Sequence, residues 1–143
     1  MSFKDLKVSP PLIKALTASE INKPFPIQKA TLPDAISGKD ILGRGQTGSG
    51  KTLAFGLALL TRLSGRNAAP MRPLALVLSP TRELAMQIND VIAPLSRSVN
   101  LNSQVVAGGL SYSKQIQALK RGVPIVVATP GRLIDLIQKK HIK

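Results

Sequence analysis

The chain has 143 residues, of which 43% are hydrophobic, and it carries 20 lysines and arginines against seven acidic residues. This composition favours one folded domain, and no apolar run is long enough to cross a membrane. The absence of cysteine excludes disulfides and cysteine-based metal sites. The formal charge of +13 favours a polyanionic partner such as nucleic acid, although a solvated surface or an acidic partner also explains such a charge. Because the first residues lack the apolar core of a secretory signal, we expect a cytoplasmic protein.

Two short helices are predicted before residue 39. Ser9 is followed by two prolines and then by apolar residues, a pattern typical of a helix start, and this helix ends near Thr17. A proline-rich linker at residues 23–26 precedes a second helix over residues 27–37. Gly38 follows directly, as is common at helix ends.

Residues 45–52 match the phosphate-loop pattern G-x-x-x-x-G-K-[ST] at all four fixed positions. A short apolar strand is predicted at residues 40–42 and an apolar helix at 53–60, which is the context that the motif requires. The backbone N–H groups of such a loop point at the phosphates of a nucleoside triphosphate. Lys51 would reach the β and γ phosphates, and the Thr52 hydroxyl would ligate Mg²⁺. Nucleotide binding is therefore the leading hypothesis.

The rest of the chain alternates apolar runs with helical patterns. The run at 74–79 is continuous, which predicts a strand buried on both faces of a parallel sheet. Alternating strands and helices imply right-handed crossovers and an α/β fold. The further predicted strands are 104–107 and 125–128, and the predicted helices are 82–96, 111–120 and one beginning at 130.

Polar residues gather where the predicted strands end. In parallel α/β sheets, ligands bind at the carboxyl ends of the strands. The exits at 80–85 and 129–132 each combine a hydroxyl, a helix N-terminus and an arginine, which together can grip a phosphodiester. The exit at 108–109 is a glycine pair, which lets a nucleic-acid strand come close. Singly, each is also a common cap, turn or local ion pair, but their joint occurrence at strand exits favours nucleic-acid binding.

With these residues in order, the chain resembles the first RecA-like domain of DEAD-box ATP-dependent RNA helicases, from Phe3 to about Lys140. The resemblance implies a parallel-sheet, RecA-like P-loop fold of the α/β class, with residues 1–38 as a Q-motif region and 39–143 as the P-loop core. The matching segments are Phe3 with 24–28 (Q motif), 45–52 (motif I), 80–85 (motif Ia), 108–109 (GG motif) and 129–132 (motif Ib).

The resemblance also implies ATP and Mg²⁺ as cofactors and RNA as a partner. Lys51 and Thr52 would be the catalytic residues, and Thr52 the metal ligand. Phe3 would stack on adenine, while the Gln28 amide, which can donate and accept at once, would recognise its edge. The implied nucleotide-binding residues are Phe3, Lys23, Gln28, Gln46, Thr47, Gly48, Ser49, Gly50, Lys51 and Thr52. The implied RNA-binding residues are Pro80, Thr81, Arg82, Gly108, Gly109, Thr129, Pro130, Gly131 and Arg132.

The sequence departs from the family pattern in two places. Glu20 and Ile21 stand where the family usually has glycine and an aromatic residue, and Gly45 replaces the usual alanine. The departure at Glu20 and Ile21 weakens the expected support for the adenine pocket.

Neither Asp-Glu-Ala-Asp nor Ser-Ala-Thr occurs in the 143 residues, so the implied fold is incomplete. We expect the intact protein to be an ATP-hydrolysing helicase with a second RecA-like domain, and these residues alone to be inactive in hydrolysis. Because the missing strands lie mid-sheet in the family, the chain should rearrange, exchange strands in an oligomer or leave part of itself mobile. A nucleic-acid-binding module with a vestigial P-loop and a DNA-directed helicase remain alternatives.

Overall fold

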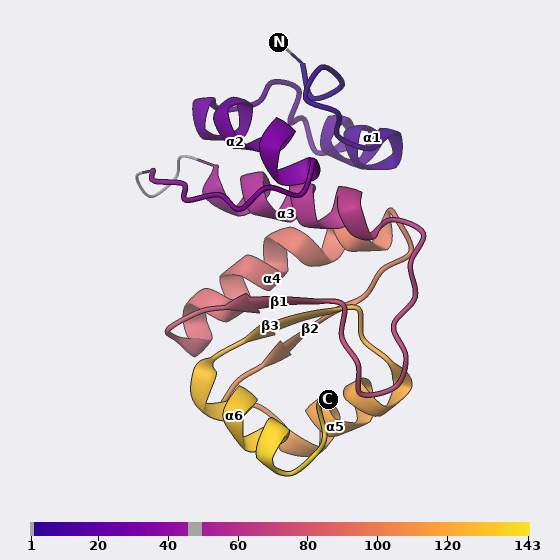
Figure 1. The fold of residues 1–143 in the computed structure, drawn as a ribbon, viewed down its shortest axis with the longest axis vertical. Coiled ribbons are helices and arrows are strands. Elements are labelled where there is room, and N and C mark those ends of the chain that lie inside the picture. The colour runs from indigo at the N-terminus through magenta and orange to yellow at the C-terminus, as the bar shows by residue number, and fades with distance from the viewer. Residues whose placement is uncertain (1, 46–49) are drawn as a thin grey trace. The chain divides into compact units, whose positions relative to one another are not determined.

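A computed structural model describes residues 2–45 and 50–143 of the chain (Figure 1). The chain divides into two compact units, Met1–Ser64 and Gly65–Lys143. The first unit is helical, whereas the second holds a sheet with helices on its faces. Within the described ranges, no helix is long and apolar enough to span a bilayer.

The first unit contains the helices α1 (Pro10–Ala18), α2 (Pro26–Ile36) and α3 (Lys51–Leu63). Both α1 and α2 begin at a proline, whose fixed φ suits the first helical position and whose missing N–H costs nothing there. Helix α2 packs against α3. The Ser9 amide, just before α1, donates to the Thr61 hydroxyl on α3 at 3.4 Å. The three helices predicted from the sequence are thus confirmed.

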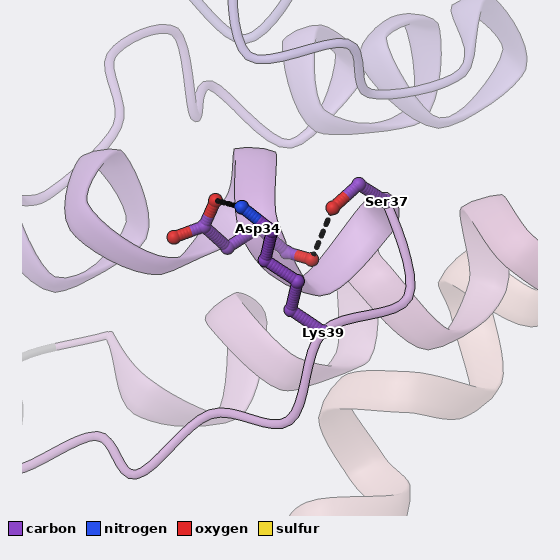
Figure 2. A network of polar contacts seen from close by, with 3 residues as sticks. All are labelled: Asp34, Ser37 and Lys39. Carbon is purple, nitrogen blue, oxygen red and sulfur yellow. Dashed lines mark hydrogen bonds and ion pairs between the residues drawn. The ribbon is translucent and has the colours of Figure 1, made fainter.

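A small polar network closes the end of α2 (Figure 2). The Ser37 hydroxyl donates to the Asp34 carbonyl oxygen at 2.8 Å, and the Lys39 ammonium lies 3.4 Å from the Asp34 carboxylate. The Lys39 amide also donates to the Asp34 carbonyl at 3.0 Å. These bonds occupy a carbonyl that the helix leaves without a partner, and they fix where the chain leaves α2.

The strand predicted at residues 40–42 is not formed, so this prediction was wrong. Residues 39–45 have no regular secondary structure, and Leu42 is 88% exposed. A strand requires a partner for its N–H and C=O groups. The three described strands pair only with one another, and all three belong to the second unit. No described strand therefore leads into the phosphate loop.

The second unit holds a three-stranded parallel sheet in the order β1-β3-β2. Leu78, Ala128 and Val106 lie side by side in its register, so the strands end at the same level. This arrangement confirms the α/β fold with a parallel sheet, incomplete as expected. Its elements in chain order are β1 (Ala75–Leu78), α4 (Arg82–Arg97), β2 (Ser103–Val106), α5 (Tyr112–Arg121), β3 (Ile125–Ala128) and α6 (Pro130–Gln138).

Helices cover both faces of this sheet (Figure 1). Helix α4 lies on one face and buries an apolar stripe that includes Ile88 and Ile92, while α5 and α6 lie on the other. The central strand β3 is buried along its whole length. The core on the α5 and α6 side consists of Val106, Ala118, Leu119, Val123, Val126, Ala128, Leu133 and Leu136.

The prediction that the strand in the run at 74–79 is buried on both faces was also wrong. The strand formed there is β1, and it is not buried on both faces. Leu76 and Leu78 remain 49% and 56% exposed. Alternate side chains of a strand point to the same face, and β1 lies at the edge of the sheet, where a neighbouring strand flanks it on one side only.

Candidate functional site

The loops that leave the three strands start together at one edge of the sheet. The Ser79 amide donates to the Ala128 carbonyl at 2.9 Å, and the Thr129 amide donates to the Val106 carbonyl at 3.0 Å. These bonds continue the sheet ladder one residue beyond the strands. The loops therefore emerge from a rigid base, and we call this region, residues 79–82, 107–111 and 129–132, the carboxyl edge.

Arg82, at the start of α4, contacts Gly109, in the loop after β2, although the two residues are far apart in the sequence. The Arg82 guanidinium occupies the space that a Cβ atom on Gly109 would fill. Gly109 has a φ of 81°, a backbone conformation that glycine adopts without strain. The glycine thus lets the arginine of the first loop lie directly against the second.

The start of α4 presents a hydroxyl beside that arginine. The Thr81 hydroxyl caps the helix by accepting from the Leu84 amide at 3.1 Å. The buried Ser79 hydroxyl donates to the Thr81 carbonyl at 3.1 Å and fixes the turn. An exposed ion pair links Arg82 to Glu83 at 3.3 Å. The Glu83 backbone amide and then the Arg82 guanidinium lower the pKa of the Glu83 carboxyl.

Arg132 is held between two side chains of α5. Its Nη1 donates to the Gln115 Oε1 at 3.0 Å, and its guanidinium carbon lies 4.7 Å from the centre of the Tyr112 ring. Gln115 is itself 2% exposed, and its Nε2 donates to the Ala107 carbonyl at 3.0 Å. One amide group thus connects the first turn of α6 to the loop after β2.

Sequence reasoning missed Gln115. A signal for Gln115 was present, because it stands three and four positions before Ala118 and Leu119 and shares their buried face. A glutamine on the apolar face of a helix needs a buried hydrogen-bond partner. Spacing alone could not name Arg132 and the Ala107 carbonyl as those partners.

The structure brings the predicted RNA-binding residues together at the carboxyl edge, although their contact with RNA stays a prediction. The helices α4 and α6 both begin there, so two positive helix ends face the same edge. Arginines, a hydroxyl and helix N-termini are suited to binding phosphate oxygens. The residues placed there are Pro80, Thr81, Arg82, Gly108, Gly109, Thr129, Pro130, Gly131 and Arg132.

A separate candidate site lies in the first unit around Gln28. Its Oε1 accepts from the Phe25 amide at 2.9 Å, and its Nε2 donates to the Gly50 carbonyl at 3.1 Å. Gly50 has a φ of 86°, and a Cβ there would overlap Gln28 and Phe25. Gln28 therefore ties the start of α2 to the residue that caps α3, the last of the phosphate loop before Lys51.

An open pocket of about 480 Å³ lies beside this glutamine. It contains the predicted residues Lys23 and Gln28, and its size suits a planar base. Glu20 lies in its wall at a φ of 62°, in the left-handed region that glycine adopts freely. The complete lining is Glu20, Ile21, Asn22, Lys23, Phe25, Gln28 and Leu53.

The remaining predicted nucleotide-binding residues have different placements. Phe3 is 3% exposed and does not line this pocket, so stacking on a base would require it to move. Lys51 is exposed and Thr52 half-buried, and both lie in the first turn of α3. Gln46, Thr47, Gly48 and Ser49 fall outside the described residues.

Acidic and histidine side chains offer no ready-made metal site. Among residues 2–45 and 50–143, no three of them come close enough together to hold an ion.

Comparisons with known proteins agree with this architecture. The DEAD/DEAH box helicase family matches residues 25–143. The chain is 44% identical over all its 143 residues to the DEAD-box ATP-dependent RNA helicase CshA from two strains of Streptococcus pneumoniae, TIGR4 and R6, and spans 27% of each. The crystal structure of the RNA helicase Prp28 from Chaetomium thermophilum bound to ADP matches with a TM-score of 0.88 and 36% identity, covering 96% of this chain and 34% of Prp28.

Proposed function

The chain belongs to the DEAD/DEAH box helicase family, and from this premise we propose that it is the nucleotide- and RNA-binding portion of an ATP-dependent RNA helicase. The relatives carry that activity in their names, and this chain spans 27% of their length. The intact protein would unwind RNA duplexes with the help of a second RecA-like domain.

The arrangement of the carboxyl edge is the observation that carries this proposal. Three strand exits start in register, and Arg82 lies against Gly109 across two of them. The groups presented there bind the sugar–phosphate backbone and read no base, which suits an enzyme that acts on RNA of any sequence. The net charge of +13 adds a favourable long-range field for a polyanion.

The first unit would bind the nucleotide. We propose that the pocket beside Gln28 receives adenine and that Lys51 and Thr52, at the positive end of α3, bind the phosphates and Mg²⁺. Gln28 already uses one acceptor site and one N–H inside the protein. Because Gln28 is 1% exposed, its second lone pair and second N–H would reach the adenine edge only after the pocket wall opens slightly.

Calorimetric titration of the chain with Mg-ADP and Mg-ATP tests the nucleotide site. We expect binding by the wild type, loss of binding in Lys51→Ala, and unchanged binding in Lys14→Ala, which removes an exposed lysine of α1. RNA affinity without nucleotide should be the same in all three proteins. Unchanged nucleotide affinity in Lys51→Ala would favour a nucleic-acid-binding module with a vestigial phosphate loop.

The same protein tests the catalytic and substrate assignments. As 143 residues it should show no RNA-stimulated ATP hydrolysis, because it lacks the acidic motif that orients the attacking water. Turnover comparable to that of an intact helicase would contradict this. Matched RNA and DNA strands of one sequence would separate an RNA-directed protein from a DNA-directed one, since only RNA carries the 2′-hydroxyl.

A further inference from the structure

We propose that Gln115 is a positioning residue for RNA binding, which aims Arg132 by anchoring it to the backbone of the glycine-pair loop. This inference rests on the proposed function, because it assumes that Arg132 contacts an RNA phosphate. It adds a residue that lies outside the matched motifs, on the buried face of α5.

The hydrogen bonds of Gln115 have a defined direction. Its Nε2 donates to the Ala107 carbonyl, so its Oε1 must face the opposite way, where it accepts from Arg132. Ala107 is fully buried and directly precedes Gly108, so its carbonyl is a fixed point at the base of the loop. The amide can therefore satisfy both partners in only one orientation.

Burial makes the anchor rigid. Gln115 is 2% exposed, and a buried polar group that loses its partner is costly. Tyr112, three positions earlier on the same helix, places its ring under the Arg132 guanidinium. The arginine is thus held at one N–H by Gln115 and at one face by Tyr112. An arginine has five N–H donors, so the others stay available for a phosphate.

The linkage also couples two loops that would grip the same strand. Arg132 lies in the first turn of α6, directly after the exit of β3, and Ala107 begins the loop after β2 that carries Gly109. Because Gln115 bridges them, a displacement of one loop displaces the arginine of the other. Preorganisation of this kind raises affinity, since less side-chain freedom is lost on binding.

The test compares RNA affinity of the wild type, Gln115→Met, Arg132→Ala and the double variant. Methionine has a similar volume and keeps the buried face filled, but it forms neither hydrogen bond. Fluorescence anisotropy of a labelled oligouridine measures Kd. We expect Gln115→Met to weaken binding about two- to tenfold and Arg132→Ala to weaken it more. The double variant should be no weaker than Arg132→Ala alone.

A matched control is available on β2. Gln104 also donates its Nε2 to a backbone carbonyl, that of Val105 at 3.0 Å, and among the residues that the structure describes it bonds to no arginine. Gln104→Met should leave Kd unchanged. Circular dichroism melts of all variants show whether each is folded at the temperature of the assay.

Salt dependence separates positioning from partial unfolding. The logarithm of the RNA association constant falls linearly with the logarithm of the salt concentration, and loss of one phosphate contact on a single strand makes this slope less steep by about 0.7. Gln115→Met should make the slope less steep, part of the way towards that of Arg132→Ala. A smaller fraction of folded protein would instead leave the steepness unchanged. If Gln115→Met weakens RNA affinity equally in the wild-type and Arg132→Ala backgrounds, the inference about Gln115 is overturned but the proposed function is not. No effect of Arg132→Ala on affinity or slope would instead remove the RNA contact on which it rests.

Discussion

The guanidinium of Arg82 lies where a side chain on Gly109 would have to go. Gly109 also has a φ of 81°, which costs a residue with a Cβ about 1–2 kcal/mol. We therefore expect Gly109→Ala to lower the free energy of unfolding by about 1 kcal/mol and to push Arg82 out of its place. RNA affinity should fall as well, and urea unfolding followed by RNA titration measures both effects.

The neighbouring glycine provides the control for this prediction. A Cβ on Gly108 meets no atom within 4 Å. Gly108→Ala should thus leave the free energy of unfolding nearly unchanged, which makes it the control for the stability effect. If both alanine variants bind RNA as tightly as the wild type, the contact between Arg82 and Gly109 has no part in binding.

Gln28 supports a second prediction, in the first unit. Gln28→Ala leaves the Phe25 amide and the Gly50 carbonyl without their partner, so we expect the free energy of unfolding to fall by about 1–3 kcal/mol. It also removes the groups proposed to read adenine. Titration with ADP and GDP should show a preference for ADP in the wild type and its loss in the variant.

Lys29→Ala is the control, because Lys29 is an exposed neighbour on the same helix. It should keep both the stability and the preference for ADP. An ADP preference that survives in folded Gln28→Ala would show that another group recognises the base.

Local patterns predicted the second unit well. The apolar runs predicted at residues 104–107 and 125–128 correspond to β2, which lies one residue earlier, and to β3. These features depend on neighbours along the chain. The exposed Leu76 could not be foreseen in the same way, because burial of a strand's side chains depends on what packs over its face, which a run of apolar residues does not specify.

Interactions between residues that are distant in the sequence set the other limit on what the sequence could predict. Residues 40–42 have the composition of a strand but no pairing partner among the described strands. Gln115 was overlooked because its two partners come from separate loops. The motif residues indicated that the strand exits carry the chemistry, whereas the side chains that hold them in place became visible only with the fold.

Glu20 occupies a backbone conformation suited to glycine, with a φ of 62°. A non-glycine residue there costs about 1–2 kcal/mol, while glycine loses about 0.5–1 kcal/mol more entropy on folding. Glu20→Gly should thus raise the free energy of unfolding by up to about 1 kcal/mol. Ser19→Gly is the control, because Ser19 has a φ of -94° and gains nothing from glycine. Urea unfolding should show the two variants moving in opposite directions, and a loss of stability in both would argue against strain at Glu20.

We expect the carboxylate of Glu83, which lies 3.3 Å from Arg82, to compete with RNA for that arginine. The pKa of Glu83 is lowered by its own amide and by Arg82, so the carboxylate is charged at every pH above about 4.5, its ordinary value. Its contribution to stability is complete above that pH and is lost as the pH falls through the lowered pKa. Glu83→Gln should therefore tighten RNA binding about two- to fivefold at neutral pH, and its stability should differ from that of the wild type only above this acidic range.

Asp90→Asn on the same helix adds the same unit of positive charge and is the matched control. Asp90 lies on α4, eight positions after Arg82, and is exposed. Anisotropy titrations should show a larger gain for Glu83→Gln than for Asp90→Asn, because only Glu83 pairs with the arginine that is proposed to hold the phosphate. Equal gains would mean that net charge alone attracts the RNA and that Arg82 is not its contact.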